Sequence, residues 1–247
     1  MKTNFKILIS ALLFVGVIGS CQKDISSESD TSPVTIRFSL MAYGSPIDTA
    51  FQYTNFGGEK FNVSSFKFYI TAIEFANSAT SVSEKNTYHL VDLAQPASQQ
   101  FNVSLKTGEY DKINFIVGVD STRNVSGAQT GALDPTNGMF WTWNTGYIFA
   151  KLEGRSPSSA APFQKLTHHI GGFRTGENAI RKITLAMPFE IGRAKELVIN
   201  ADVQKWFDGP HQISIASNAS VMSPGGVALK IADNYASMFS VNKVVNP

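Results

Sequence analysis

Short runs in which apolar and polar residues alternate are the feature that most constrains the fold of this chain. The run from Val34 to Leu40 places every second residue on one apolar face, which is the period expected of a half-buried strand. Many short strands separated by glycine-containing turns, without alternating helices, predict a mostly β, antiparallel sandwich of the immunoglobulin or cupredoxin type. Further strands are predicted at 66–70, 73–75, 88–93, 101–105, 113–119, 147–152, 166–170, 183–187 and 197–203.

One helix is predicted near the C-terminus. Val227, Ile231, Tyr235 and Phe239 recur every four residues, and a Ser-Pro-Gly sequence precedes them as a plausible start. We expect this helix to pack on one end or face of the sandwich. The sequence shows no internal repeat, so residues 33–247 are predicted to form a single domain with long loops.

The N-terminus has the pattern of a bacterial lipoprotein signal. Lys2 and Lys6 precede an apolar stretch, which ends in small residues and Cys21. This pattern predicts a signal peptide at 1–20, an acylated Cys21, a flexible tether at 21–32 and an outer-membrane lipoprotein, either periplasmic or surface-exposed. The alternatives are an ordinary secretory signal or an N-terminal membrane helix. Because Cys21 is the only cysteine, the domain has neither a disulfide nor a thiolate metal site.

Charge and motifs exclude several functions. Residues 1–20 hold two lysines and no acid, so the chain from Cys21 onward carries 19 Lys and Arg against 19 Asp and Glu. This balance, without clustered cations, argues against a nucleic-acid partner. Nucleophile-elbow, phosphate-loop, zinc-protease and dinucleotide-binding motifs are all missing from the sequence, so we predict a protein that is not an enzyme.

The stretch from Gly118 to Gly154 combines two tryptophans, several glycines and two pairs of oxygen-bearing side chains. We interpret it as an ordered loop and turn up to Gly138, followed by a strand from about Phe140 to Leu152. The oxygen ligands are of the type that calcium takes, but the same residues are ordinary turn formers and their spacing is not that of an EF-hand. The tryptophans are Trp141 and Trp143, and the possible calcium ligands are Asp120, Asn124, Asp134 and Asn137.

Histidines are the candidate ligands for a transition metal, and the chain has four. His168 and His169 are adjacent, so on a strand at most one of them faces a given site. His169 precedes Gly171 and Gly172, which allow close backbone approach or a sharp turn. His89 shares a strand face with apolar residues, and its simpler interpretation is a buried, hydrogen-bonded histidine.

The same stretch resembles the MbnP family. The resemblance extends to flanking segments and covers the chain from about Val34 to Phe239. The matching segments are Gly118-Val119-Asp120-Ser121, Gly127-Ala128, Leu133-Asp134-Pro135, Gly138-Met139, Trp141-Thr142-Trp143-Asn144, Gly146-Tyr147, Lys151-Leu152-Glu153-Gly154, Phe68-Tyr69-Ile70, Tyr88-His89-Leu90-Val91-Asp92 and His169-Ile170-Gly171-Gly172.

The resemblance implies copper and a partner. Relatives are exported proteins paired with a di-haem protein similar to cytochrome c peroxidases, which oxidises a tryptophan to kynurenine, and kynurenine with histidine can hold copper. By this resemblance Trp141 or Trp143, together with His169 or His89 and the neighbouring His168, would form the site. The chain departs from some relatives because no histidine lies near Trp141 in sequence. The alternatives are an envelope module without copper, stabilised by calcium or by nothing, and a lipoprotein that recognises a glycan or another surface protein.

Overall fold

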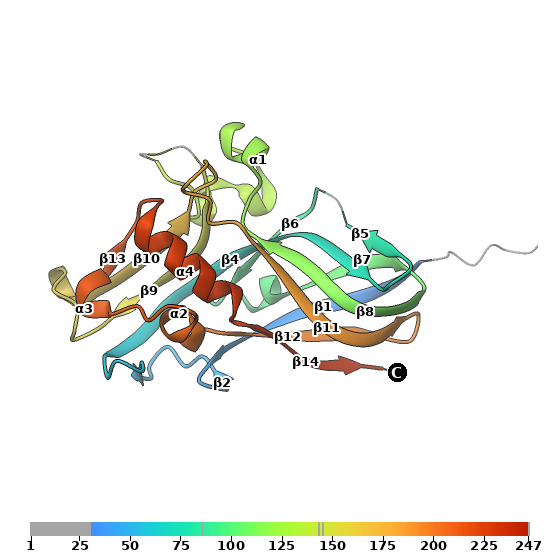
Figure 1. Cartoon of the computed structure of the whole chain (residues 1–247), viewed down its shortest axis with the longest axis horizontal. Helices are drawn as coiled ribbons and strands as arrows, with labels where there is room; N and C mark the ends of the chain where they lie inside the picture. Colours follow the sequence, from blue (N-terminus) through green and yellow to red (C-terminus); the bar gives the residue numbers. More distant parts are fainter. Residues whose placement is uncertain (1–30, 85, 143, 145, 247) are drawn as a thin grey trace, which may run out of the picture.

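The computed structural model describes residues 31–84, 86–142, 144 and 146–246. These residues form two β-sheets that pack against each other (Figure 1). The smaller sheet has the order β14 (Phe239–Val245), β12 (Glu196–Asp202), β1 (Thr31–Ala42) and β2 (Ser45–Pro46), and β7 (Gln100–Lys106) also pairs with β1. The larger sheet has the order β11 (Arg181–Ile191), β8 (Gly108–Val117), β4 (Lys60–Ala76), β9 (Ile148–Arg155), β10 (Lys165–Gly171) and β13 (Ser220–Val221), and β3 (Tyr53–Thr54), β5 (Ser81–Ser83) and β6 (Tyr88–Asp92) also pair with β4.

Strand directions are mixed within this sandwich. The predicted mostly β sandwich is confirmed, and most of its strand pairs are antiparallel, but β1 pairs with β12 and β10 with β13 in parallel. Alternation in a sequence shows which face of a strand is buried and does not show the direction of the neighbouring strand. The two parallel pairs could therefore not be predicted from the sequence of the strands themselves.

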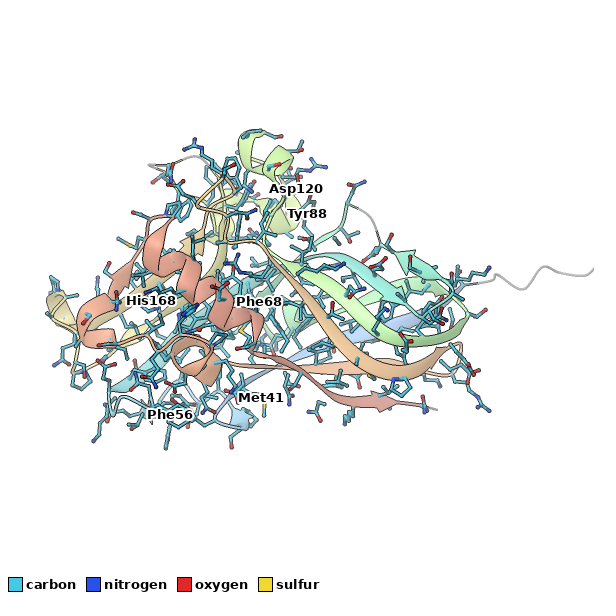
Figure 2. All side chains as sticks on the ribbon, viewed as in Figure 1. Met41, Phe56, Phe68, Tyr88, Asp120 and His168 are labelled. Carbon is cyan, nitrogen blue, oxygen red and sulfur yellow. The ribbon has the colours of Figure 1, made fainter. Side chains whose placement is uncertain are left out.

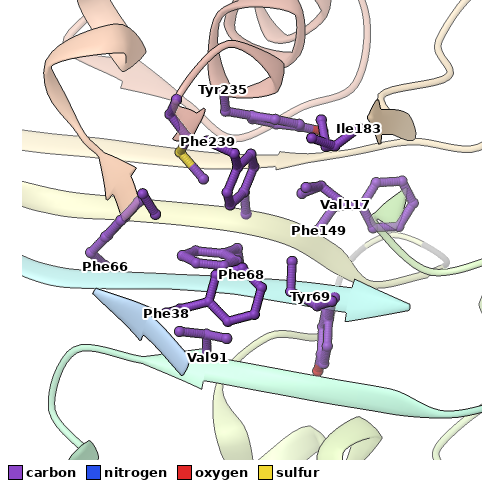
Figure 3. Packing of buried hydrophobic residues seen from close by; sticks show 14 of the residues in the cluster. Phe38, Phe66, Phe68, Tyr69, Val91, Val117, Phe149, Ile183, Tyr235 and Phe239 are labelled. Atoms are coloured by element: carbon purple, nitrogen blue, oxygen red, sulfur yellow. The ribbon is translucent and has the colours of Figure 1, made fainter. Parts of the chain in front are cut away.

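Aromatic rings join the two sheets. The alternating residues of β1 point inward as predicted, and the Phe38 ring meets Phe68 of β4 and Phe115 of β8 edge to face at 5.8 and 5.9 Å between centroids. Phe239 completes this cluster from β14 (Figure 3). Each fully buried phenylalanine side chain contributes roughly 1.5–3 kcal/mol, so this cluster is a main reason why the sheets stay together.

The long strand β4 organises the larger sheet. At Lys67 it pairs with Asp92 of β6 on one edge and Lys151 of β9 on the other. From Ile70 onward β8 takes the place of β9 along the same edge, and the register with β8 shifts after Thr71, where Ala72 has a positive φ of 51°. The strands β9, β10 and β13 therefore form one end of the sheet, and this end carries the candidate site.

Helices cover the inner face of that end. The predicted C-terminal helix is α4 (Gly226–Ala236), which buries Ile231 and Tyr235, and Tyr235 packs on Trp206 of α2 (Gln204–Asp208). Phe239, which the four-residue spacing assigned to the helix, instead begins β14. Among the described residues, no helix has the length and apolar character needed to cross a membrane. The remaining helices are α1 (Ser121–Val125), α3 (Ile215–Asn218), η1 (Pro96–Gln99), η2 (Gly131–Leu133), η3 (Pro135–Asn137) and η4 (Pro162–Gln164).

Candidate functional site

The glycine-rich stretch is fixed to the outer face of the larger sheet by polar side chains of β4 and β9. Lys67 donates a hydrogen bond to the carbonyl of Asn137 at 3.3 Å, and Lys151 donates to that of Gly138 at 2.6 Å. The buried Tyr69 hydroxyl donates to the carbonyl of Ala132 at 3.0 Å. These bonds satisfy carbonyls that the short η2 and η3 turns leave open, so the stretch is an ordered layer on the sheet.

Trp141 lies in a tight hairpin that leads into β9. Its backbone N–H donates to the carbonyl of Gly146 at 3.2 Å, and Phe140 and Tyr147 form an isolated bridge. The strand expected from about Phe140 therefore begins only at Ile148, and Trp141 precedes it. Trp143, the other tryptophan of the prediction, lies outside the described residues.

The indole of Trp141 packs on the outer face of β10. Its side chain is 3% exposed. A Cβ added to Gly171 would meet the backbone carbonyl oxygen of Tyr147 first and would come within 2.8 Å of the indole Cη2 atom, so the Tyr147 backbone and the Trp141 ring together occupy the place that a side chain at 171 would take. Gly171 is thus required for close packing, in agreement with the expectation from the Gly171-Gly172 pair.

His169 lies on the same outer face, two residues before Gly171. Its Nε2 is 2.7 Å from Oε1 of Glu153, a residue of β9. This hydrogen bond is the main cause that holds the pKa of Glu153 below its ordinary value, and the nearby Lys151 acts in the same direction. Residues two apart on a strand have Cα atoms about 6.6 Å apart, so the Trp141 indole, which packs at Gly171, and His169 lie on the same face of β10. Donation from Nε2 leaves Nδ1 as the nitrogen whose lone pair is available to a metal.

His168 points to the opposite face and is completely buried. Its Nδ1 accepts a hydrogen bond from the indole N–H of Trp206 at 2.9 Å, and Nε2 lies 2.6 Å from the carbonyl oxygen of Asn218. Because an indole nitrogen only donates and a carbonyl only accepts, the proton of His168 must be on Nε2. Both ring nitrogens are therefore engaged, and burial lowers the pKa of His168 to about 4.

His89, the third predicted histidine ligand, lies on a different strand, β6, and stacks on an aromatic ring of the other sheet. The ring stacks on Phe101 of β7, with 3.6 Å between centroids and an angle of 5° between the planes. Its Nε2 is 3.4 Å from Oε2 of Glu84, and burial lowers the pKa of His89. Within the described residues, no three His, Cys, Asp or Glu side chains form a group that could hold a metal ion.

The four predicted calcium ligands act as turn and cap residues. Asp120 caps α1 by accepting from the N–H of Arg123 at 3.0 Å, and the Tyr88 hydroxyl also donates to it (Figure 2). Asn124 is buried, and its Oδ1 accepts from the N–H of Tyr147 at 2.8 Å. Asp134 caps η3 by accepting from Thr136 at 2.8 Å, and Asn137 donates to the carbonyls of Gly131 and Ala132 at 3.1 and 3.0 Å.

Two residues of this region were not predicted from the sequence. Glu153 lies beside His169 because β9 pairs with β10, and it is the hydrogen-bond partner of that histidine. Trp206, the third tryptophan, is the hydrogen-bond partner of His168. Neither has a local motif, since both relationships join residues that are far apart in sequence.

Comparison with known proteins agrees with this architecture. A family model described as MbnP matches residues 31–223. A solved structure, "MbnP from Methylosinus trichosporium", superimposes with a TM-score of 0.56 over 75% of this chain and 80% of that chain. Its sequence is 16% identical to this one, so the likeness concerns the fold. No curated protein matches the sequence.

Proposed function

Since the chain belongs to the MbnP family, we propose that it is a lipid-anchored envelope protein that binds copper and is not itself catalytic. The ligands would be His169 and Trp141 after oxidation of that tryptophan to kynurenine by a di-haem partner. The observation that carries this proposal is the packing of Trp141 against Gly171, on the face of β10 that also carries His169.

The donor chemistry at this position fits copper once the indole is opened. An imidazole suits copper, and kynurenine offers an aniline-type nitrogen that an indole does not. The described part of the chain holds no group of three metal-binding side chains of the usual types. The unmodified protein should therefore bind copper weakly, and oxidation of Trp141 should be required for tight binding.

The hydrogen bond between His169 and Glu153 would orient the imidazole. A carboxylate that accepts from one ring nitrogen fixes the tautomer and raises the basicity of the other nitrogen. This arrangement is present in the structure, where Nε2 of His169 lies 2.7 Å from Oε1 of Glu153. Glu153 thus serves as a positioning residue for His169 in the proposed site.

Anchoring rests on the N-terminal sequence. Cys21, the proposed site of acylation, lies outside the described residues, as does the signal sequence before it. Labelling of growing cells with an alkyne fatty acid tests the anchor, because wild-type protein should incorporate the label and Cys21→Ser should not.

Copper binding is tested on protein purified from its native host. We expect intact-mass and peptide spectra to show kynurenine at Trp141, and copper to co-purify. His169→Gln should lose the copper and retain the kynurenine, whereas the matched variant His211→Gln should retain both. Unmodified tryptophan throughout, or copper unaffected by His169→Gln, would refute the proposal.

The near-complete burial of Trp141 favours a second candidate, an envelope module without copper in which this tryptophan is part of the core. Calcium would then be the only metal, with Asp120 and Asp134 as its first candidate ligands. Calorimetry separates the candidates: calcium binding that is lost on Asp120→Ala or Asp134→Ala, without copper binding, would support the module.

A further inference from the structure

An open groove of about 700 Å³ continues the outer face of β9 and β10 beyond His169 and Glu153. Its floor is formed by outward side chains of β4, β9 and β10, and the η4 turn and the end of β13 form its sides. We call it the η4 groove and define it by these lining residues: Asn62, Ser64, Glu153, Arg155, Phe163, Lys165, Thr167, Ser220 and Met222.

Two cations oppose each other on the floor of the η4 groove. Arg155 of β9 and Lys165 of β10 are directly paired in the sheet and both are exposed. Like charges at opposite positions destabilise a sheet. Among the described residues neither cation has an ion-pair partner, because the nearby Glu153 is engaged by His169 and Lys151. The fold thus tolerates a local repulsion that an anion in the groove would relieve.

Apolar side chains stand at the margin of the same groove. Phe163 is 75% exposed and Met222 is 42% exposed, which is unusual for side chains of their size. Phe163 also has a φ of 59° and a ψ of 24°, a left-handed conformation that non-glycine residues rarely adopt. An exposed phenylalanine in a left-handed turn contributes little to the core, so its ring, with Met222 on the margin of the same groove, is available to a partner.

We propose that the η4 groove binds an acidic segment of a partner protein. Carboxylates of the segment would bridge Arg155 and Lys165, and an apolar side chain would pack on Phe163 and Met222. The groove adjoins the His169–Glu153 pair, so the partner would be held next to the proposed copper site.

A protein segment fits this position better than a lipid surface. The groove lies at the end of the molecule formed by β9, β10 and β13, whereas the described chain starts at Thr31 at the opposite end (Figure 1). An anchor before Thr31 would hold the opposite end of the domain at the membrane. This step, and the position of the partner next to the copper site, rest on the proposed function.

Fluorescence anisotropy tests the proposal with the lipidated mature protein in phosphatidylcholine nanodiscs. The probe is a labelled peptide, Asp-Glu-Phe-Asp-Glu-Leu, and its control replaces each acid by lysine. We expect saturable binding of the acidic peptide only, weakened by added salt. The double variant Arg155→Glu/Lys165→Glu should bind at least about tenfold more weakly, since attraction becomes repulsion. The matched variant Lys182→Glu/Lys230→Glu, which has the same net charge, should bind like wild type.

Further outcomes keep this proposal separate from copper binding. Phe163→Gly should weaken binding of the acidic peptide while the circular dichroism spectrum of the protein stays unchanged. His169→Gln should abolish copper binding and leave peptide binding intact. Equal binding by the two charge-reversal variants, or no binding by wild type, would overturn the groove proposal without affecting the copper proposal. Co-flotation of the nanodiscs with phosphatidylglycerol vesicles, lost in the Arg155→Glu/Lys165→Glu variant, would assign the groove to lipid instead.

Discussion

Acid should destabilise this protein through one buried histidine. His168 of β10 (labelled in Figure 2) is completely buried and points to α2, with Nδ1 bonded to the Trp206 indole and Nε2 to the carbonyl of Asn218. A proton added at Nδ1 would break the bond to Trp206 and place a charge in an apolar interior. The folded protein therefore keeps His168 neutral, and its pKa falls to about 4, with burial as the largest cause.

The sign and size follow from proton linkage. In the unfolded chain His168 has its ordinary pKa of 6.5 and takes up a proton as the pH falls below that value. The folded state takes up the same proton only near pH 4, so the unfolded state binds more protons between these values. The free energy of unfolding should fall as the pH decreases from 6.5 to 4, by about 3 kcal/mol for this residue in total. That loss is a large fraction of the 5–15 kcal/mol typical of a domain.

Urea unfolding at a series of pH values from 7.5 to 4.5 measures this loss. His168→Gln should have a shallower pH dependence than wild type by about 2 kcal/mol over this range, whereas His211→Gln should follow wild type. Nitrogen chemical shifts give a second readout on the unmutated protein, and they should show Nε2-protonated, neutral His168 down to pH 5. Titration of His168 near pH 6.5 in the folded state, or parallel curves for wild type and His168→Gln, would refute this account.

Three further substitutions test the packing of the site. Gly171→Ala should lower the free energy of unfolding by about 1–3 kcal/mol, because the new methyl group meets the backbone carbonyl of Tyr147 and the ring of Trp141, and the fluorescence of the tryptophans should change with it. Asn124→Ala should cost about 1–3 kcal/mol in a denaturant titration, because the buried N–H of Tyr147 loses its acceptor. Phe163→Gly should be neutral or stabilising by up to about 1 kcal/mol, because relief of the left-handed strain outweighs the added freedom of the unfolded chain; a loss above 1 kcal/mol would contradict the strain argument.

Burial along each strand could be predicted from sequence, and the partners of each strand could not. The alternation from Val34 to Leu40 reports which residues of β1 face the core, because a strand has a period of two. Nothing in that run indicates that its neighbour is the distant β12, or that the two run in parallel. Phe239 is a second example, since its spacing continues the helical pattern while its backbone begins β14 and pairs with Ala201 of β12.

The candidate site was predictable to a similar degree. Side-chain alternation required His168 and His169 to face opposite ways, and the structure places one in the core and the other on the outer face. His168 is buried on the same face as Leu166 and Ile170, and its hydrogen-bond partner there is Trp206, a residue of a short helix with no periodic signal. The role of Glu153 could not be predicted from the sequence either, since only the register of β9 and β10 brings its carboxylate to His169.

The tryptophan segment and the His-Ile-Gly-Gly segment can be interpreted only as a packed pair. Read separately, the first suggests a hairpin and the second a flexible end of a strand. In the fold the missing side chain of Gly171 admits both the Tyr147 backbone and the Trp141 indole, and His169 lies on the same face of β10. A bulkier residue at 171 would meet both the Tyr147 carbonyl and the ring, so this glycine holds together the hairpin and the strand on which any joint chemistry of this tryptophan and this histidine depends.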